Sequence, residues 1–254
     1  KFRLSFIILK FAFSKILQKT TMDIKKASKL KANDNVAYLI TSDKDLSSKD
    51  FSAAEITYIK KEIKAEQKQI TLNRLTNMVY VVVLGAEADY KATEKARIAA
   101  HSLTTAVNQA KIKALSIVSD LAVTLSFIEG IALTNYQFLK YFSDKKINTL
   151  TELNVLGKIE TAELVELQNT VDATNYAKDL VNEPQSFLTA TQISEEIKTL
   201  GKEAGFTVEV FNKEKIESLE MGGLLAVNKG SIEPPTFSIL EWKPKNAKNK
   251  KPIV

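Results

Sequence analysis

The 254-residue sequence has no cysteine, a single histidine and only eight glycines. Disulfides and cysteine-ligated metal sites are therefore excluded, and the lack of cysteine is compatible with a reducing compartment. The single histidine, His101, cannot supply the paired imidazoles of a two-histidine metalloprotease helix. Lys229-Gly230-Ser231 has the wrong order for a Gly-Lys-Ser phosphate loop, so no such loop is predicted.

The sequence also lacks an apolar run long enough to span a bilayer, which needs ~20 residues. Residues 1–21 are apolar and basic, but Lys10 interrupts the apolar run and no small-residue cleavage site follows, so a signal peptide is not predicted. Because the first methionine is Met22, we interpret residues 1–21 as a leader upstream of translation and exclude them from the fold. An amphipathic surface or transit segment is the alternative interpretation. We expect no membrane partner.

Charge of one sign is concentrated in the same N-terminal stretch. The formal net charge is +6, and residues 1–21 hold five basic side chains and no acid. The remaining chain has 31 basic and 30 acidic residues, so it is nearly neutral. A nearly neutral body offers little electrostatic attraction to phosphates, and we do not expect a nucleic-acid partner.

From Met22 onward, predicted strands alternate with predicted helices, which is typical of an α/β architecture with a mainly parallel sheet. Apolar or alternating runs predict strands at 36–41, 79–84, 114–118, 206–212, 224–227 and 236–242, with another beginning at 252–254. Helical patterns cover 92–111, 128–142, 161–181, 190–204 and 213–221. The polar stretch 143–160 is interpreted as the passage between two units.

The side chains that could carry chemistry each have a structural interpretation. His101 lies off the apolar stripe of its helix, which predicts a solvated or satisfied histidine. The aromatic residues at 136, 138, 141 and 142 are spaced as core residues. Helical carboxylates are typical of a solvated face; they are Asp172, Asp179, Glu183, Glu195 and Glu196. Taken alone, the residues describe a two-unit α/β protein with no visible active site.

The stretch YAKDLVNEPQSFL (176–188) predicts a helix end followed by a new helix. Pro184 restricts Glu183 to extended geometry, so the preceding helix must end near Asn182. Thr189 and Gln192 have the spacing of a capping box, and Gly205 is placed to close the helix that follows. Glu183 is therefore interpreted as a helix-exit residue rather than a general base.

Three segments, taken together, resemble the leucyl aminopeptidase (cytosol aminopeptidase) family of two-metal metallo-exopeptidases. Residues 177–189 (AKDLVNEPQSFLT) are similar to an Arg-Asp-Leu-Val-Asn-x-Pro run, with Lys178 in the place of arginine. Residues 221–235 (MGGLLAVNKGSIEPP) are similar to a Met-Gly-(Gly/Ala)-Leu-Leu-Ala-Val strand and a Gly-Ser-x-x-Pro-Pro turn. Upstream, the Glu-Gly-x-x-Leu-x-x-Tyr-x-Phe segment is matched. The matching residues are Glu129, Gly130, Leu133, Tyr136, Phe138, Asp179, Leu180, Val181, Asn182, Pro184, Met221, Gly222, Leu225, Gly230, Ser231 and Pro235.

The resemblance implies a fold and a domain order. Residues 22–160 would form an N-terminal macrodomain-like α/β domain. Residues 161–254 would form the incomplete start of a phosphorylase/hydrolase-like α/β aminopeptidase domain. The likeness is strong from about residue 125 and rests on pattern alone before it.

The resemblance also implies a reaction for the full-length protein. In the family, two divalent metal ions (Mn or Zn) polarise the scissile carbonyl and activate a bridging water, so that N-terminal residues are hydrolysed from peptides. A lysine joins the carboxylate ligands, and a second lysine and an arginine stabilise the tetrahedral intermediate. Members act in peptide catabolism in the cytoplasm, and typically assemble as hexamers through their catalytic domains.

The family's metal-ligating and catalytic residues cannot be assigned to any position of this sequence. The first ligating lysine follows a Pro-(Ile/Val)-x-Leu-Val-Gly strand, and the sequence stops at Pro252-Ile253-Val254. We therefore predict no catalytic, cofactor-binding or metal-ligating residue in this sequence. We expect this fragment to bind no metal tightly, to lack peptidase activity and to aggregate through parallel strands left unpaired at Val227, Leu240 and Val254.

A different class of function is the alternative: a non-catalytic macrodomain-like module that binds ADP-ribose or nucleic acid. An ADP-ribose pocket needs a glycine-rich phosphate loop, and none is visible in residues 22–125. Calorimetry with ADP-ribose, and the salt dependence of DNA binding, distinguish these alternatives from the aminopeptidase.

Overall fold

The computed structural model describes residues 22–245, 247, 249 and 251. They form two compact units, with the boundary between Ala177 and Lys178, inside helix α4 (Thr161–Asn182). In this described part of the chain, no helix is both long and apolar enough to cross a bilayer. The strand predicted at 252–254 lies outside the described residues.

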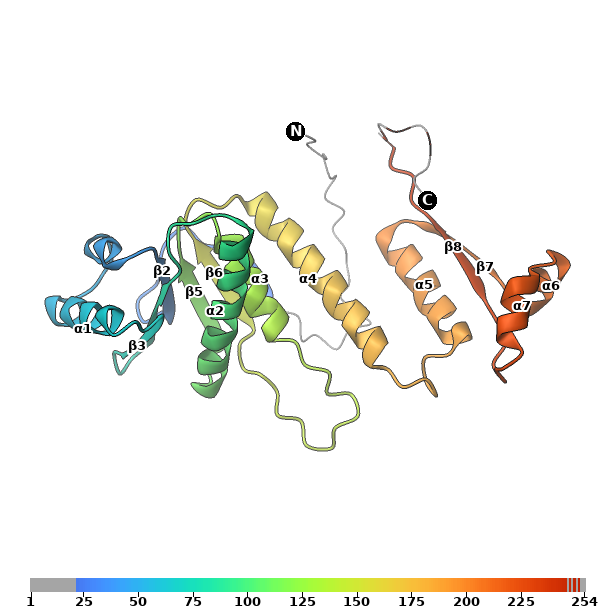
Figure 1. Ribbon diagram of the computed structural model, residues 1–254, viewed down its shortest axis with the longest axis horizontal. Helices are drawn as coiled ribbons and strands as arrows, with labels where there is room; N and C mark the ends of the chain where they lie inside the picture. The colour runs from blue at the N-terminus through green and yellow to red at the C-terminus, as the bar shows by residue number, and fades with distance from the viewer. Residues whose placement is uncertain (1–21, 246, 248, 250, 252–254) are drawn as a thin grey trace. The chain divides into compact units, whose positions relative to one another are not determined.

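Six strands form one sheet in the first unit, in the spatial order β1-β6-β5-β2-β4-β3 (Figure 1). They are β1 (Asp23–Lys26), β2 (Val36–Ile40), β3 (Gln69–Asn73), β4 (Met78–Val83), β5 (Ala114–Val118) and β6 (Glu152–Leu156). All neighbours are parallel except β3 and β4, which are antiparallel. The central strands β2 and β4 are buried on both faces, which explains their continuous apolar sequences. The predicted α/β fold with a mostly parallel sheet is confirmed.

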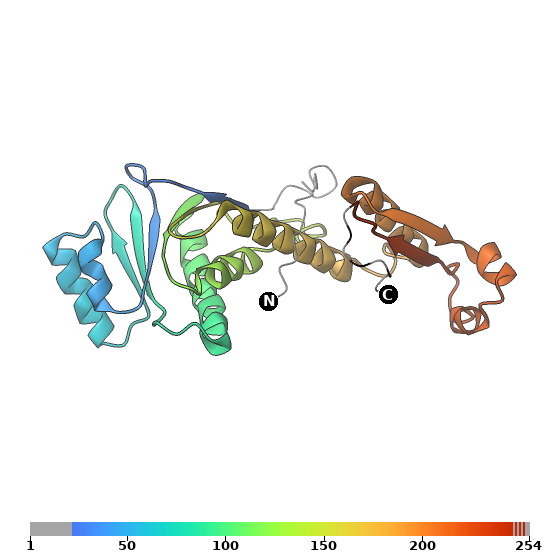
Figure 2. The same cartoon turned by 90° about the horizontal axis from the view of Figure 1, so that it is seen from above.

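Helices cover both faces of this sheet (Figures 1 and 2). They are α1 (Ala53–Lys64) with the short 3-10 helix η1 (Asp43–Ser48), and, on the opposite face, α2 (Tyr90–Gln109) and α3 (Thr124–Thr134). Leu103 and Phe127 belong to the apolar cluster beneath α2 and α3, and Ile59 belongs to the cluster beneath α1. The stripe predicted for α2 is confirmed at Ala96 and Ala100, which are fully buried.

Close contact between α2 and α3 depends on Gly130. A Cβ at this position would lie 2.8 Å from the Cβ of Ala100 and 2.8 Å from the backbone of Arg97. Beside it, the Arg97 guanidinium donates to Glu129, with 2.7 Å between Nε and Oε2. Glu129 and Gly130, two residues of the Glu-Gly motif, therefore join two helices of the first unit.

Side-chain amides hold the connection between α3 and β6. Asn108 Oδ1 accepts hydrogen bonds from the backbone N–H groups of Thr149 (2.8 Å) and Leu150 (3.1 Å). Asn108 Nδ2 donates to Asn135 Oδ1 at 3.0 Å, and Asn135 Nδ2 donates to Leu150 O at 2.8 Å. Asn148 Nδ2 donates to Asn135 O at 3.1 Å. The amides give these backbone groups partners that no strand or helix provides.

A partly buried ion pair links α1 to the β3–β4 turn. Arg74 contacts Glu55 through two bonds, Nε–Oε1 at 2.7 Å and Nη2–Oε2 at 3.0 Å. Its guanidinium also lies 5.8 Å from the centre of the Phe51 ring, which packs edge-on against Tyr38. Glu55 accepts from the Ser52 N–H as part of the capping box of α1. The hydrogen bonds from Arg74, and then those from Ser52, lower the pKa of Glu55 to about 2.

We expect this pair to make the first unit sensitive to acid. Because the folded-state pKa of Glu55 is below its ordinary value of 4.5, its contribution is complete above about pH 4.5 and is lost as the pH falls toward 2. A charge-assisted pair of this kind contributes about 1.5–3 kcal/mol. Urea unfolding between pH 2 and 7 should show this loss, and Glu55→Gln should flatten it. Equal slopes in both proteins would contradict the assignment.

The second unit contains a two-stranded sheet and short helices. Its elements are α5 (Ala190–Ala204), β7 (Thr207–Phe211), α6 (Lys213–Ser218), α7 (Gly222–Asn228) and β8 (Phe237–Glu241). α5 packs on β7 and β8, where Ser194 Oγ donates to Thr236 Oγ1 at 2.8 Å. Half of the predicted capping box is present: the Thr189 side chain accepts from Gln192 N, whereas the Gln192 side chain donates to Glu196. Gly205 closes α5 with a left-handed φ of 75°, also as predicted.

One predicted element of the second unit is wrong, and another is a strand but pairs in the opposite orientation. Leu224–Val227 is part of helix α7, not a strand, because a run of four apolar residues fits either structure and its Leu and Ala residues favour a helix. β8 forms at the predicted place, but it pairs with β7 in antiparallel rather than parallel orientation. Of the predicted strand edges that fall on described residues, Leu240 lies in a strand and Val227 does not.

Two predictions in the first unit also need correction. Residues 152–156 of the supposed passage form β6, which lies between β1 and β5. Only Leu153 and Val155 are fully buried in it, so its apolar signal is short. The helix predicted to reach 142 ends at Thr134, where Asn135 turns to the amide network. Tyr141 and Phe142 consequently remain 54% and 59% exposed instead of entering the core.

Candidate functional site

In open parallel sheets, ligands bind beyond the carboxyl ends of the strands. In this sheet, the ends of β5 and β6 are packed tightly together. Gly157 follows β6 with a φ of 137°, and a Cβ there would lie 1.7 Å from Ser119 O. The Asp120 carboxylate accepts from Lys158 N at 2.8 Å. This part of the sheet end is closed by the protein's own backbone.

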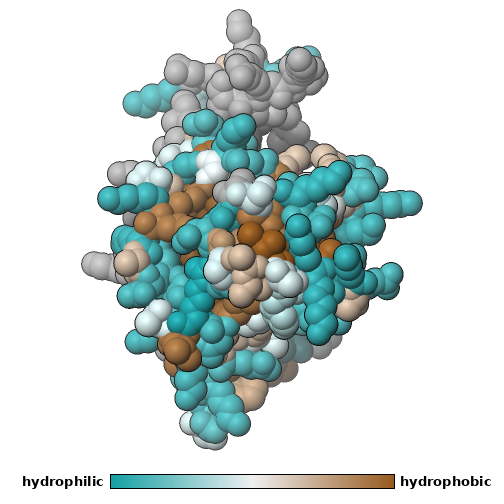
Figure 3. Space-filling model, turned by 90° about the vertical axis from the view of Figure 1, so that its left-hand side faces the viewer, coloured by the Kyte–Doolittle hydropathy of each residue, from teal (hydrophilic) through white to brown (hydrophobic). Residues whose placement is uncertain are grey.

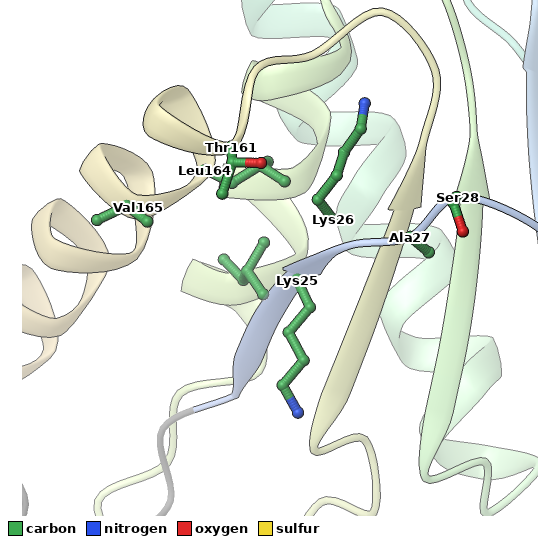
Figure 4. Close-up of a pocket in the computed structure, with 8 residues that line it drawn as sticks. Lys25, Lys26, Ala27, Ser28, Thr161, Leu164 and Val165 are labelled. Atoms are coloured by element: carbon green, nitrogen blue, oxygen red, sulfur yellow. The ribbon is translucent and has the colours of Figure 1, made fainter.

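A groove lies at the edge of the same sheet, between β1 and the first turns of α4 (Figure 4). Its volume is about 530 Å³. It is lined by Ile24, Lys25, Lys26, Ala27, Ser28, Thr161, Leu164 and Val165. Both walls therefore come from the first unit. β1 was missed in the sequence because its four residues, DIKK, contain one apolar side chain and no periodic signal.

The two lysines of the groove point in opposite directions (Figure 4) and are both engaged. Lys26 Nζ donates to the carbonyls of Gly157 and, at 2.6 Å, Ile159. Lys25 Nζ lies 3.2 Å from Asp23 Oδ2 and 3.3 Å from Glu152 Oε2. The bonds to Asp23 and then to Glu152 raise the pKa of Lys25. The lysines therefore link β1 to the start of β6 and to the segment that follows β6. The groove itself offers mainly apolar surface with two hydroxyls.

The Asp172 carboxylate on α4 is linked to the edge strand β1 through the side chain of Gln168. Asp172 Oδ1 accepts from Gln168 Nε2 at 2.9 Å, and Gln168 Oε1 accepts from the backbone N–H of Ile24 at 2.9 Å. Burial raises the pKa of Asp172. Asp172, one of the helical carboxylates singled out in the sequence, therefore departs from a solvated face. Its hydrogen bond goes to a residue that holds β1, which is a structural role.

The other residues singled out are dispersed. His101 is exposed on α2, as predicted. Glu195 pairs with Lys198 at 2.6 Å, and Glu196 accepts from Gln192 Nε2 at 3.0 Å. Among the described residues, no group of three or more His, Asp or Glu side chains is placed to hold a metal ion. The donors needed for a two-metal centre are not brought together in this part of the chain.

The stretch 178–189 forms the end of one helix and the start of the next. α4 ends at Asn182, and Glu183 N donates to the carbonyls of Asp179 (3.1 Å) and Leu180 (3.3 Å). Pro184 O then accepts from Phe187 N at 2.8 Å. The predicted helix exit at Asn182 is confirmed.

The Gly-Ser-x-x-Pro-Pro segment is a hydrogen-bonded turn. Ser231 N donates to Asn228 O at 2.8 Å, and Ser231 Oγ accepts from Glu233 N at 3.1 Å. Asn228 Nδ2 donates to Glu233 O at 3.0 Å. The backbone N–H and the Oγ of Ser231 both form hydrogen bonds within the turn, which gives the position of Ser231 in the motif a structural explanation.

Comparison with known proteins gives the same architecture. The structure resembles a mutant of tomato leucine aminopeptidase with a TM-score of 0.69, 17% identity, and coverage of 90% of this chain and 52% of that chain. It resembles the bottromycin maturation enzyme BotP in complex with Mn with a TM-score of 0.66, 25% identity, and coverage of 84% and 46%. The chain thus has the mixed α/β fold, with a mostly parallel sheet, seen in leucine aminopeptidases.

The sequence comparisons also lead to aminopeptidases. Residues 175–254 match the model of the cytosol aminopeptidase family, catalytic domain. A probable cytosol aminopeptidase of Sulfurihydrogenibium sp. is 33% identical over 198 residues, which are 72% of this chain and 39% of that protein. The chain is a relative of the cytosol aminopeptidases, an enzyme family, and the predicted resemblance is confirmed. It spans well under two thirds of the length of this relative.

Proposed function

We propose that residues 22–160 are the N-terminal domain, and residues 161–254 the beginning of the catalytic domain, of a metal-dependent aminopeptidase. The observation that carries the proposal is the match of residues 175–254 to the catalytic domain of the cytosol aminopeptidase family. In this proposal the full-length protein removes N-terminal residues from peptides and works in the cytoplasm as a homo-oligomer, a hexamer by analogy with the family.

The proposed cofactors of the full-length protein are two divalent metal ions, Mn or Zn, which would activate a water for attack on the peptide carbonyl. The complex of BotP with Mn supports this choice. The described residues of this chain do not fit such a centre, because their carboxylates are scattered and several are already paired. We therefore assign no catalytic step to them.

We expect the 254-residue chain alone to show no hydrolysis of leucine-p-nitroanilide, with or without Mn²⁺ or Zn²⁺. An active leucine aminopeptidase measured under the same conditions provides the positive control. Thermal unfolding of the same sample should show that the chain is folded, so that a lack of turnover is not a consequence of unfolding. Metal-stimulated hydrolysis that co-purifies with the 254-residue chain would contradict the expected lack of activity.

A macrodomain-like description of the first unit is a further part of the proposal. Its support is the six-stranded order β1-β6-β5-β2-β4-β3, with helices on both faces. We do not extend this likeness to ADP-ribose binding, since the ends of β5 and β6 are closed around Gly157 and the groove lysines are engaged. Calorimetry with ADP-ribose on the same sample should give no heat of binding. A saturable heat would favour the binding module.

A further inference from the structure

The two edge strands of the six-stranded sheet, β1 and β3, differ in how well they are protected against pairing with another strand. At one edge, the ladder to β6 uses Asp23 N and Ala27 N, so the N–H of Ile24 faces outward. Gln168 Oε1 accepts that outward N–H, and two lysines follow in the strand. Side-chain caps and lysines are common means of preventing strand addition at an edge. The β1 edge is therefore blocked.

The β3 edge has no such protection. Val83 N donates to Lys68 O and Arg74 N donates to Asn77 O, which fixes the residues of β3 that bond to β4. By alternation, the backbone groups of Gln69, Thr71 and Asn73 face away from β4. Within the described chain, β3 has no strand partner other than β4. The strand contains no charge, proline or glycine, and its exposed side chains are Thr71 and Asn73.

We propose that β3 pairs with β3 of a second copy of this chain, antiparallel and two-fold symmetric about Thr71. In this register Thr71 faces its own copy, and Gln69 faces the partner's Asn73. Each pair exchanges two backbone hydrogen bonds. Hydroxyl then meets hydroxyl, which is a favourable cross-strand pair. The amides of Gln69 and Asn73, which can each donate and accept hydrogen bonds, also face one another. Each contact between two different residues then occurs twice, once in each direction across the axis, as a two-fold interface requires.

Charge is compatible with this self-pairing. The register brings Lys68 near Arg74 of the other copy, but the Arg74 guanidinium is already neutralised by two bonds to Glu55. Ile70 and Leu72 would remain buried in the apolar cluster beneath α1 in each copy. Their pairing across the interface would join the two clusters. Leu75, 95% exposed at the β3–β4 turn, would approach Gln67 of the second copy. The end of the unit that carries α1 and β3 faces the viewer in Figure 3, where hydrophobic patches lie among hydrophilic residues.

The inference is independent of the proposed function, because it uses a surface of the first unit and no catalytic residue. Pairing of one strand edge buries little area, so the dimer is expected to be weak and concentration-dependent. Sedimentation equilibrium of the 254-residue chain measures it. Thr71→Lys and Thr71→Asp each place like charges opposite one another and should weaken the dimer by about tenfold or more.

Mixing the two variants provides the sharpest readout. In equal amounts, Thr71→Lys and Thr71→Asp should restore the dimer, since opposite charges then meet at the symmetry axis. Thr105→Lys adds the same charge on an exposed position of α2 and should leave association unchanged. The proposed pairing is wrong if neither Thr71 variant weakens dimer association. It is also wrong if the mixture associates as weakly as either variant alone.

A second test does not depend on charge. Because the chain has no cysteine, Thr71→Cys introduces a single thiol. The Cα separation of an antiparallel hydrogen-bonded pair, about 5.5 Å, is within disulfide range. Mild oxidation should give a covalent dimer much faster for Thr71→Cys than for Thr105→Cys. Equal rates for the two variants, or a wild-type chain that remains monomeric at high concentration, would contradict the proposal.

Discussion

Gly157→Ala is expected to destabilise the first unit by about 3–5 kcal/mol. Two effects add at this position. The φ of 137° lies in a region that side chains with a Cβ rarely adopt, and the added Cβ would lie 1.7 Å from Ser119 O. The obstacle is backbone, held by the pairing of β5 with β6, so it cannot rotate away. Urea unfolding followed by hydrogen exchange of β2 and β5 amides measures the loss.

Gly85→Ala is the matched control for that measurement. Gly85 belongs to the same unit and also has a positive φ, 83°, but its new Cβ would meet only the flexible side chain of Glu87. The expected loss is about 1–2 kcal/mol, from backbone strain alone. Equal losses for Gly85→Ala and Gly157→Ala would show that the approach of Ser119 O has no energetic consequence. The closed end of β5 and β6 would then have to be abandoned.

Asn108→Ala is expected to have the second-largest effect, a loss of about 2–4 kcal/mol from the first unit. The substitution removes the acceptor for two backbone N–H groups and the donor to Asn135. Leu150, whose N–H loses its partner, is fully buried, so water cannot readily replace the amide. Urea unfolding gives the size, and faster amide exchange at Thr149 and Leu150 locates it.

Asn148→Ala serves as the control within the same network. Its amide makes one bond, to Asn135 O, and lies nearer the surface. Its loss should be about 1 kcal/mol, and exchange at Leu150 should remain slow. If Asn108→Ala is no worse than Asn148→Ala, then Asn108 does not organise the connection between α3 and β6.

The sequence predicts best where a segment carries its own signal. The run at 79–84 is continuous and β-branched, so it could only be a strand or a short buried helix segment, and it forms β4. Thr189 and Gly205 bracket α5 because capping chemistry is local. The helix end before Pro184 follows from one steric rule.

The failures occur where partners distant in sequence decide the structure. β1 has one apolar residue among four and β6 carries only a short alternation, and each becomes a strand by pairing with a neighbour far along the chain. Asn135 ends α3 by bonding to residues of the following connection, which no helix rule anticipates. Leu224–Val227 is short enough that either structure satisfied its pattern. The cases of β1, β6 and Asn135 are tertiary effects that local propensity does not contain, whereas the error at Leu224–Val227 is an ambiguity of the local pattern.

For the candidate site, the sequence predicted the family but no functional residue in this stretch. The groove beside β1 was missed because its lysines lie on a strand that itself has little signal. The resemblance motifs turned out to have structural roles in the described residues. Glu129 and Gly130 join α2 to α3, and Ser231 closes a turn. Motif residues can thus mark a family through its packing rather than its chemistry.

Whether the residues of this chain hold a metal ion can be measured by titrating the purified 254-residue chain with Mn²⁺ and following the electron paramagnetic resonance signal of the free ion. We expect the free-ion signal to rise in proportion to added Mn²⁺, as in buffer, because the described residues do not assemble a metal centre. Saturable loss of the signal, with one or two Mn²⁺ ions taken up per folded chain, would contradict it.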